Sequence, residues 1–138
     1  MIGELRFLYV GAGDTSVAVD FYTTHLGARL RWRFRHFGAD VAGLELGDGP
    51  LVLLTDHRPP GSVLPIYAVD DLAVAVASLR ASGARLVGPM GTPEGDVVVV
   101  EVPGGGEVVH ELAFLDVVRP GAMDRAYADP DNDHRVQG

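Results

Sequence analysis

The tetrapeptide Gly27-Ala28-Arg29-Leu30 returns as Gly83-Ala84-Arg85-Leu86, 56 positions later in the chain. Two further matches occur at nearly the same distance. They pair Asp40-Val41 with Asp96-Val97 and Val17-Ala18-Val19 with Val74-Ala75-Val76. A common offset is typical of an internal repeat. The sequence therefore predicts that the 138 residues contain two copies of one structural unit.

Both halves predict the same succession of elements: strand, helix and three strands. In the first half, Asp14, Thr15 or Ser16 is expected to cap a helix that ends near Leu26 and Gly27. The strands around it are predicted at Arg6–Val10, Leu30–Phe37, Val41–Leu46 and Leu51–Thr55. The second half predicts a helix between Asp70 or Asp71 and Gly83, with strands at Leu64–Val69, Leu86–Val87, Val97–Val102 and Val108–Phe114. The predicted fold class is α+β, with two βαβββ modules.

Some predicted strands are apolar without alternation, notably Leu51–Leu54 and Val97–Val100. Such runs are typical of strands that are buried on both faces. A single helix per module covers only one face. The other face must therefore be covered by a ligand cavity, by the other module or by a second chain.

Composition excludes several kinds of chemistry. The chain has a net charge of −8, which argues against nucleic acid and anionic membranes as partners. It contains no cysteine and no lysine, so thiolate nucleophiles, disulfides, iron–sulfur clusters and lysine Schiff bases are excluded. The N-terminal residues lack a basic, apolar secretion signal and no apolar run is long enough to span a membrane, so a cytoplasmic protein is expected.

The sequence resembles members of the vicinal oxygen chelate superfamily, which includes glyoxalases, bleomycin-resistance proteins and extradiol dioxygenases. The resemblance rests on Phe21-Tyr22, Leu26-Gly27, Val69–Leu72 and Val109–Leu112. It implies one domain over residues 1–118, with modules at about 4–57 and 62–115, whose curved mixed sheet surrounds a cavity. The Asp-, Pro- and Gly-rich residues 119–138 are expected to form a flexible or surface-draped tail.

The resemblance also implies four positions for metal ligands, which match Phe7, Leu54, Leu64 and Glu111. Only Glu111 carries a donor atom, so we expect no metal site and no cofactor. The family includes metal-free members that sequester cytotoxic antibiotics, usually as dimers. The departure of this sequence from the metal pattern favours that branch.

Strand alternation around the four implied positions predicts a largely apolar cavity lining. It consists of Phe7, Tyr9, Val52, Leu54, Leu64, Ile66, Val109 and Glu111. Burial of Glu111 among these residues would let it act as a general base or accept a hydrogen bond from a ligand. The alternative is that Glu111 simply pairs with an arginine.

The stretch from Arg29 to His36 alternates four arginines with Leu30, Trp32, Phe34 and His36. The sequence does not decide which side of this strand meets the cavity. Trp32 and Phe34 would offer stacking surfaces to a flat ligand, whereas the arginines would contact an anionic one. A third alternative places the aromatic side in the core and the arginines in water.

Taken together, these features predict a metal-free protein that binds a small hydrophobic or aromatic natural product, most simply as a homodimer. The alternative is a small enzyme of the same fold. It would use Glu111 as a general base, or a metal site built from His36 or His57 with Glu111.

Overall fold

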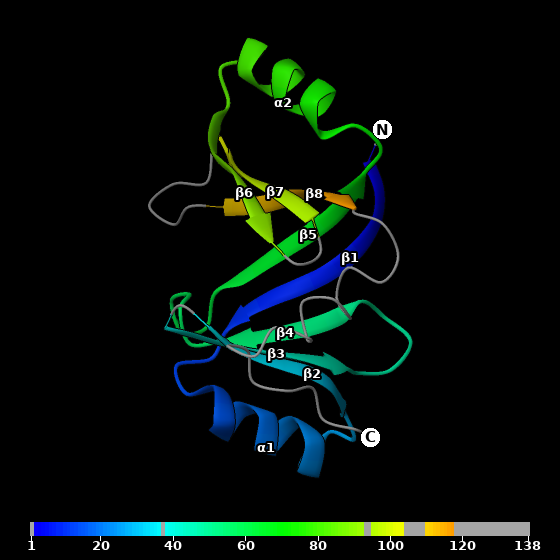
Figure 1. The fold of residues 1–138 in the computed structure, drawn as a ribbon, viewed down its shortest axis with the longest axis vertical. Helices are drawn as coiled ribbons and strands as arrows, with labels where there is room; N and C mark the ends of the chain where they lie inside the picture. Colours follow the sequence, from blue (N-terminus) through cyan, green and yellow to red (C-terminus); the bar gives the residue numbers. More distant parts are fainter. Residues whose placement is uncertain (1, 37, 93–94, 104–109, 118–138) are drawn as a thin grey trace. The chain divides into compact units, whose positions relative to one another are not determined.

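The computed structural model describes residues 2–36, 38–92, 95–103 and 110–117, and it contains the predicted βαβββ order twice (Figure 1). The first set of elements is β1 (Ile2–Gly11), α1 (Thr15–His25), β2 (Arg29–His36), β3 (Ala39–Glu45) and β4 (Leu51–Thr55). The second set is β5 (Val63–Val69), α2 (Leu72–Ala81), β6 (Arg85–Thr92), β7 (Gly95–Val102) and β8 (His110–Val117). The α+β prediction and the repeated order are confirmed.

The chain divides into two compact units close to the predicted module boundary. We call residues 7–63 the first module, and residues 2–6 together with the described part of 64–117 the second module.

Both helices begin at an aspartate. Asp14 accepts a hydrogen bond from the Val17 backbone N–H at 3.1 Å, and Asp71 does the same for Val74 at 3.1 Å. Each aspartate satisfies a donor that the first helical turn leaves without a backbone acceptor. Just beyond each helix, Gly27 and Gly83 adopt positive φ angles of 71° and 82°, as expected for helix-terminating glycines. Local sequence thus sets both ends of both helices.

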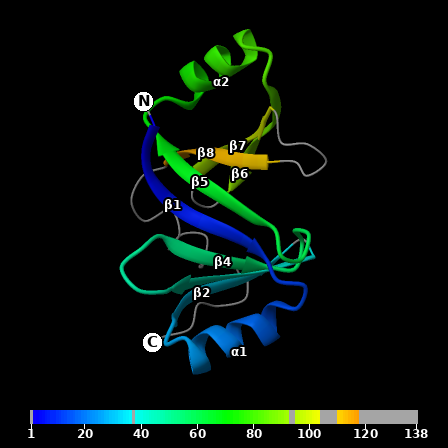
Figure 2. The same cartoon turned by 180° about the vertical axis from the view of Figure 1, so that it is seen from behind.

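In the first module the strand order is β2-β3-β4-β1, with β1 parallel to β4 and the other pairs antiparallel. Helix α1 packs on one face of this sheet (Figure 2). The core between helix and sheet consists of Val19, Ala28, Ala42, Leu44, Val52 and Leu54. Alternation along each strand leaves the intervening residues on the face away from α1.

In the second module the order is β5-β8-β7-β6, with β5 parallel to β8 and the other pairs antiparallel. Its core against α2 consists of Val69, Leu72, Val98, Val100 and Phe114. Strand β6 runs to Thr92 and is much longer than the predicted Leu86–Val87. The prediction ended at Val87 because Gly88 and Pro89 are turn-forming residues. The strand continues beyond them, and its register against β7 shifts between Val87 and Met90.

The prediction of strands buried on both faces is confirmed. All four residues of Val97–Val100 are buried, as are Val52, Leu53 and Leu54. Successive residues of a strand point to opposite faces, so both faces of β4 and β7 are covered.

Two predicted features lie outside the described residues: Val109 and the tail at 119–138. Within the described part of the chain, neither helix has the length and apolar character needed to cross a membrane.

Candidate ligand-binding face

Four aromatic side chains share the face of the first-module sheet that is turned away from α1. Phe7 and Tyr9 lie on β1, where the next residue, Val10, packs toward the α1 core. Trp32 and Phe34 lie on β2, with their ring centroids 5.5 Å apart. We call this side of the sheet the aromatic face. Phe7, Trp32 and Phe34 are buried in it, and Tyr9 is half-buried.

A β-bulge decides how β2 presents its side chains. The pairing of β2 with β3 shifts register between Leu30 and Trp32, so Leu30 packs against the α1 core while Trp32 points to the opposite face. The expectation that Leu30 and Trp32 share one side was therefore wrong. The alternation resumes after the bulge, and Arg33 reaches Ser16 at the start of α1. Trp32 and Phe34 therefore lie on the face away from α1, and both are buried.

One row of residues crosses all four strands at the same level. The register pairs Trp32 with Gly43, Gly43 with Leu53, and Leu53 with Tyr9. Three strand spacings make this row about 14 Å long. The indole ring lies directly over Gly43, because a Cβ atom placed there would be 2.4 Å from Trp32 Cε2. Glycine therefore provides the space that the indole occupies.

Val52 and Leu54 do not lie on this face, which corrects the predicted lining. Both belong to the core against α1, and their register partners on β1 are Leu8 and Val10. The predicted strand phase was wrong by one residue, so Leu54 was expected on the face where Leu53 lies. On β4, Leu53 and Thr55 are the residues that share the face of Tyr9 and Gly11.

Tyr9 ends the row in a polar contact that the sequence did not predict. Its hydroxyl lies 2.7 Å from Nε2 of His57, and the two rings meet edge to face with centroids 5.7 Å apart. His57 is held in place because its backbone N–H donates to the Thr55 hydroxyl at 3.2 Å. No local pattern links residues 9 and 57, since the parallel pairing of β1 with β4 brings them together.

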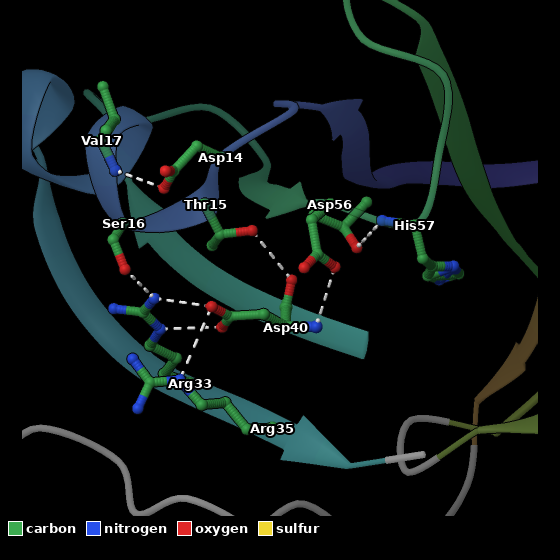
Figure 3. A network of polar contacts seen from close by, with 10 residues as sticks. Asp14, Thr15, Ser16, Val17, Arg33, Arg35, Asp40, Asp56 and His57 are labelled. Carbon is green, nitrogen blue, oxygen red and sulfur yellow. Dashed lines mark hydrogen bonds and ion pairs between the residues drawn. The ribbon is translucent and has the colours of Figure 1, made fainter. Parts of the chain in front are cut away.

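A separate polar network joins β2, β3 and the start of α1 on the opposite side of the sheet (Figure 3). Arg33 donates to both carboxylate oxygens of Asp40, at 2.8 and 2.7 Å, and also to the Ser16 hydroxyl at 2.7 Å. These Arg33 hydrogen bonds hold the pKa of the Asp40 carboxyl below its ordinary value, although burial opposes the effect. The network therefore fixes β2 and β3 to the helix.

The remaining arginines of β2 lie at the surface. Arg29 and Arg31 both contact Glu45, and Arg35 lies 3.6 Å from Asp40. All three arginine side chains are about half exposed or more. Arg29, Arg31 and Arg35 therefore match the alternative in which the arginines face water.

In the second module, Leu64, Ile66 and Glu111 lie on the face away from α2. Tyr67 on β5 and Leu112 and Phe114 on β8 point the other way and pack toward α2. Leu64 and Ile66 are buried, whereas Glu111 is half-buried and stands opposite Glu101 in the β7–β8 register. Glu101 in turn lies 3.5 Å from the guanidinium of Arg85. Two carboxylates therefore adjoin on an otherwise aliphatic face.

The residues present do not fit a divalent metal ion of the kind the superfamily uses. Phe7 and Leu64 have no lone pairs, and Leu54 faces the core against α1. Thr55 lies on the same face of the sheet as Phe7 and Tyr9, but it is fully buried. Its hydroxyl accepts a hydrogen bond from the backbone N–H of His57. In the described residues no three side chains of histidine, aspartate or glutamate gather into a group that could hold a metal. The alternative metal site that uses His36 falls outside the described part of the chain, because only the backbone of His36 is described.

A family model for the Glyoxalase/Bleomycin resistance protein/Dioxygenase superfamily matches residues 5–105, and the chain belongs to that superfamily. No curated protein matches the chain. Among solved structures, a methylmalonyl-CoA epimerase from Mycobacterium tuberculosis has a TM-score of 0.69 and 23% identity, covering 87% of this chain and 91% of its own.

Two other structures share the fold. A hypothetical protein from Bacillus halodurans has a TM-score of 0.69 at 13% identity, covering 84% of this chain and 95% of its own. A variant methylmalonyl-CoA epimerase from Streptomyces coelicolor in complex with 2-nitronate-propionyl-CoA has a TM-score of 0.62 at 17% identity, covering 87% and 100%. At these identities the likeness establishes the glyoxalase fold.

Proposed function

We propose that this protein binds a flat aromatic small molecule on the aromatic face of the first module and releases it chemically unchanged, without a metal. The row Trp32–Gly43–Leu53–Tyr9 is the observation that supports this proposal. The row has Trp32, whose indole covers Gly43, at one end and Tyr9 at the other, with Leu53 between them, and all but Tyr9 are buried. Small-molecule sites typically have apolar and aromatic walls that carry only a few polar groups.

The size and chemistry of the row indicate the class of ligand. The two strand spacings from Gly43, under the indole, to Tyr9 span about 10 Å, roughly the length of three fused rings. Indole and phenol faces attract aromatic partners by offset stacking or edge contacts. We expect the ligand to be a hydrophobic or aromatic natural product, as in antibiotic sequestration, bound in the cytoplasm.

Binding can be measured directly because Trp32 is the only tryptophan of the chain. Titration with phenanthrene should change Trp32 fluorescence and give a dissociation constant in the micromolar range or below. Calorimetry should show that Trp32→Ala weakens binding by about 1–3 kcal/mol, the value of a buried aromatic contact. Val74→Ala is the control, because Val74 is exposed on α2 in the second module. Equal effects of both substitutions, or no binding, would refute the proposal.

A second candidate function is catalysis with Glu111 as a general base. Its support is the position of Glu111 on the face away from α2, beside Glu101, together with the likeness to methylmalonyl-CoA epimerases. For a general base, Glu111→Gln should slow turnover about 10²–10⁴-fold and leave binding intact. The test substrate is methylmalonyl-CoA in deuterated water, with mass spectrometry to detect exchange. Exchange that Glu111→Gln abolishes would establish the enzyme and overturn simple sequestration.

We further propose that the protein is a homodimer. The support is the apolar surface of α1, where Val17 and Phe21 are 66% and 54% exposed and lie one helical turn apart. Exposed apolar patches favour association between protein surfaces. Sedimentation should give twice the chain mass at micromolar concentration, and Phe21→Glu should shift the protein toward monomer. A monomeric wild-type protein at that concentration contradicts the proposal.

A further inference from the structure

We infer that a bulge at Gly88-Pro89 prevents the outer edge of β6 from pairing with a strand of a second copy of this chain. The inference concerns association between molecules and does not rest on the proposed ligand. The surface concerned lies in the second module, and it is distinct from the α1 surface around Val17 and Phe21 on which the proposed dimer depends.

Strand β6 has one side without a neighbouring strand. It is the last strand in the order of the second module, and among the described strands it pairs with β7 alone. Every residue of β6 except Leu86 is exposed, whereas Val97–Val100 of the adjoining β7 is buried. A strand with one unpaired side presents backbone donors and acceptors that can pair with another chain. The outer side of β6 is therefore a potential site of association.

One extra residue interrupts β6. The register pairs Val87 with Val99 and then, after a shift, Met90 with Val97. Two residues, Gly88-Pro89, thus stand opposite a single residue of β7, which defines a β-bulge. In a regular strand, residues three positions apart lie on opposite faces. The extra residue instead brings Val87 and Met90 to the same face, the one away from α2.

The side chains of Val87 and Met90 favour pairing with another strand. They are 49% and 46% exposed and adjoin buried valines of β7. In a symmetric antiparallel pair of β6 strands centred at Gly88-Pro89, Val87 of each copy would stand opposite Met90 of the other. Such a pair would bury both side chains and continue the sheet across two copies. Apolar exposure alone therefore favours association through β6.

The Gly88-Pro89 bulge opposes this pairing at its centre. Pro89 has no N–H to donate to a further strand. Gly88 has a φ of 105°, and a Cβ atom placed there would lie 2.8 Å from the carbonyl oxygen of Val97, so the close approach to β7 requires glycine. The bulge divides the outer edge into the short segments Arg85–Val87 and Met90–Thr92. Neither segment is long enough for a stable strand pair.

The repeat-equivalent strand of the first module is interrupted as well. The register of β2 shifts between Leu30 and Trp32, and Leu30 matches Leu86 at the repeat distance of 56. Strand β2 also carries four arginines, and charged side chains are a second feature that discourages strand addition. Strand β6 contains only Arg85. It therefore depends on the Gly88-Pro89 bulge, and Pro89 is the residue to change.

The test replaces Pro89 by threonine in the full-length chain, because threonine supplies an N–H and favours strands. Sedimentation velocity over a micromolar concentration series should show larger assemblies than the wild type. Association should become about 2- to 10-fold stronger for each hydrogen bond that is restored. Pro60→Thr is the matched control, because Pro60 is exposed in the turn between β4 and β5, and it should sediment as the wild type does.

A second variant separates edge pairing from unfolding. Adding Met90→Lys to Pro89→Thr places a charge on the same edge and should restore the sedimentation of the wild type. Aggregation of an unfolded chain would not be reversed by this charge. The inference is overturned if the assemblies persist in the double variant, or if Pro89→Thr sediments as the wild type does at every concentration.

Hydrogen exchange of the wild type gives a test without any substitution. Protection of the β6 amides should be the same at low and high protein concentration. Protection that grows with concentration would show that copies pair through this edge, and it would overturn the inference. A wild type that stays monomeric would refute the proposed dimer but agrees with this inference, so the two can fail separately.

Discussion

The two modules share one succession of elements but differ in what they present on the face away from the helix. The first module carries the aromatic face, whose central row is Trp32–Gly43–Leu53–Tyr9. The corresponding face of the second module is aliphatic, with two adjoining carboxylates. Its buried aliphatic members are Leu64, Ile66, Val97, Val99, Ala113 and Leu115. The helix-facing cores, by contrast, are apolar in both modules.

This contrast indicates which parts of the repeat serve folding alone. Both helix-facing cores must bury an amphipathic helix, so they remain similar. The polar network shows the same divergence. Asp40 corresponds to Asp96 at the repeat distance, but Asp96 is exposed and the position matching Arg33 is Pro89. The first module therefore has both an additional polar anchor on the α1 side and a specialised aromatic surface on the other.

The largest expected effect is the loss of stability when a buried leucine is truncated. It tests whether the aliphatic face of the second module is ordinary hydrophobic core. Leu54, against α1, and Leu115, on the face away from α2, are both 1% exposed. Each truncation to alanine should reduce the free energy of unfolding by about 2–5 kcal/mol, because it removes buried methyl groups and leaves a cavity. Urea denaturation measures both. A loss below about 1 kcal/mol for Leu115→Ala alone would show that this face lines an open space.

Gly43→Ala tests the packing of the aromatic face. The added Cβ would meet the Trp32 indole at 2.4 Å, so the ring must move, and we expect a loss of about 1–3 kcal/mol in stability. Emission of Trp32 should shift to longer wavelength as the ring becomes hydrated. Gly49→Ala is the control, because no atom lies within 4 Å of its added Cβ. Equal stability losses in the two variants would contradict the close approach of Trp32 and Gly43.

Asp40→Asn compares the polar anchor with its counterpart in the other module. The folded-state pKa of Asp40 lies below its ordinary value of 3.8, so its stabilisation is present above that pH and is lost as pH falls through the folded-state pKa. At neutral pH the variant should lose roughly 1.5–3 kcal/mol, the range for hydrogen bonds to charged groups. The gap between variant and wild type should close in acid.

Thermal or urea unfolding from pH 7 down to about pH 2.5 follows the Asp40 effect across the relevant range. Asp96→Asn is the matched control and should change stability by less than about 0.5 kcal/mol, as expected for an exposed position. A pH-independent loss in Asp40→Asn would show that packing, and not the charge of Asp40, accounts for its contribution.

The smallest expected effect concerns metal. Since Phe7 and Leu64 lack donor atoms, addition of zinc, nickel or manganese should leave the melting temperature unchanged, and purified protein should contain no stoichiometric divalent ion. Elemental analysis and thermal scans with and without chelator measure this. About one tightly bound ion per chain would instead favour the enzyme alternative.

Much of the fold was predictable because its signals are local. Asp14 and Asp71 cap the helices, Gly27 and Gly83 end them, and the repeat at 56 positions revealed the two modules. Strand β4 was predicted to the residue as Leu51–Thr55, since turn-forming residues flank it. The length of β6 was not predictable in this way, because its pairing with β7 continues beyond Gly88 and Pro89.

By itself, then, the sequence determined the α+β class, the repeated order of elements, the helix ends and the absence of donor atoms at Phe7 and Leu64. Only the tertiary structure decided which residues share a face. A single bulge before Trp32 changes the phase of β2, and the register of β1 against β4 places Leu53, not Leu54, beside Tyr9. Because side chains alternate every residue along a strand, a shift of one position moves a whole set to the other face. Likewise, Tyr9 and His57 meet through non-local strand pairing, which no local pattern encodes.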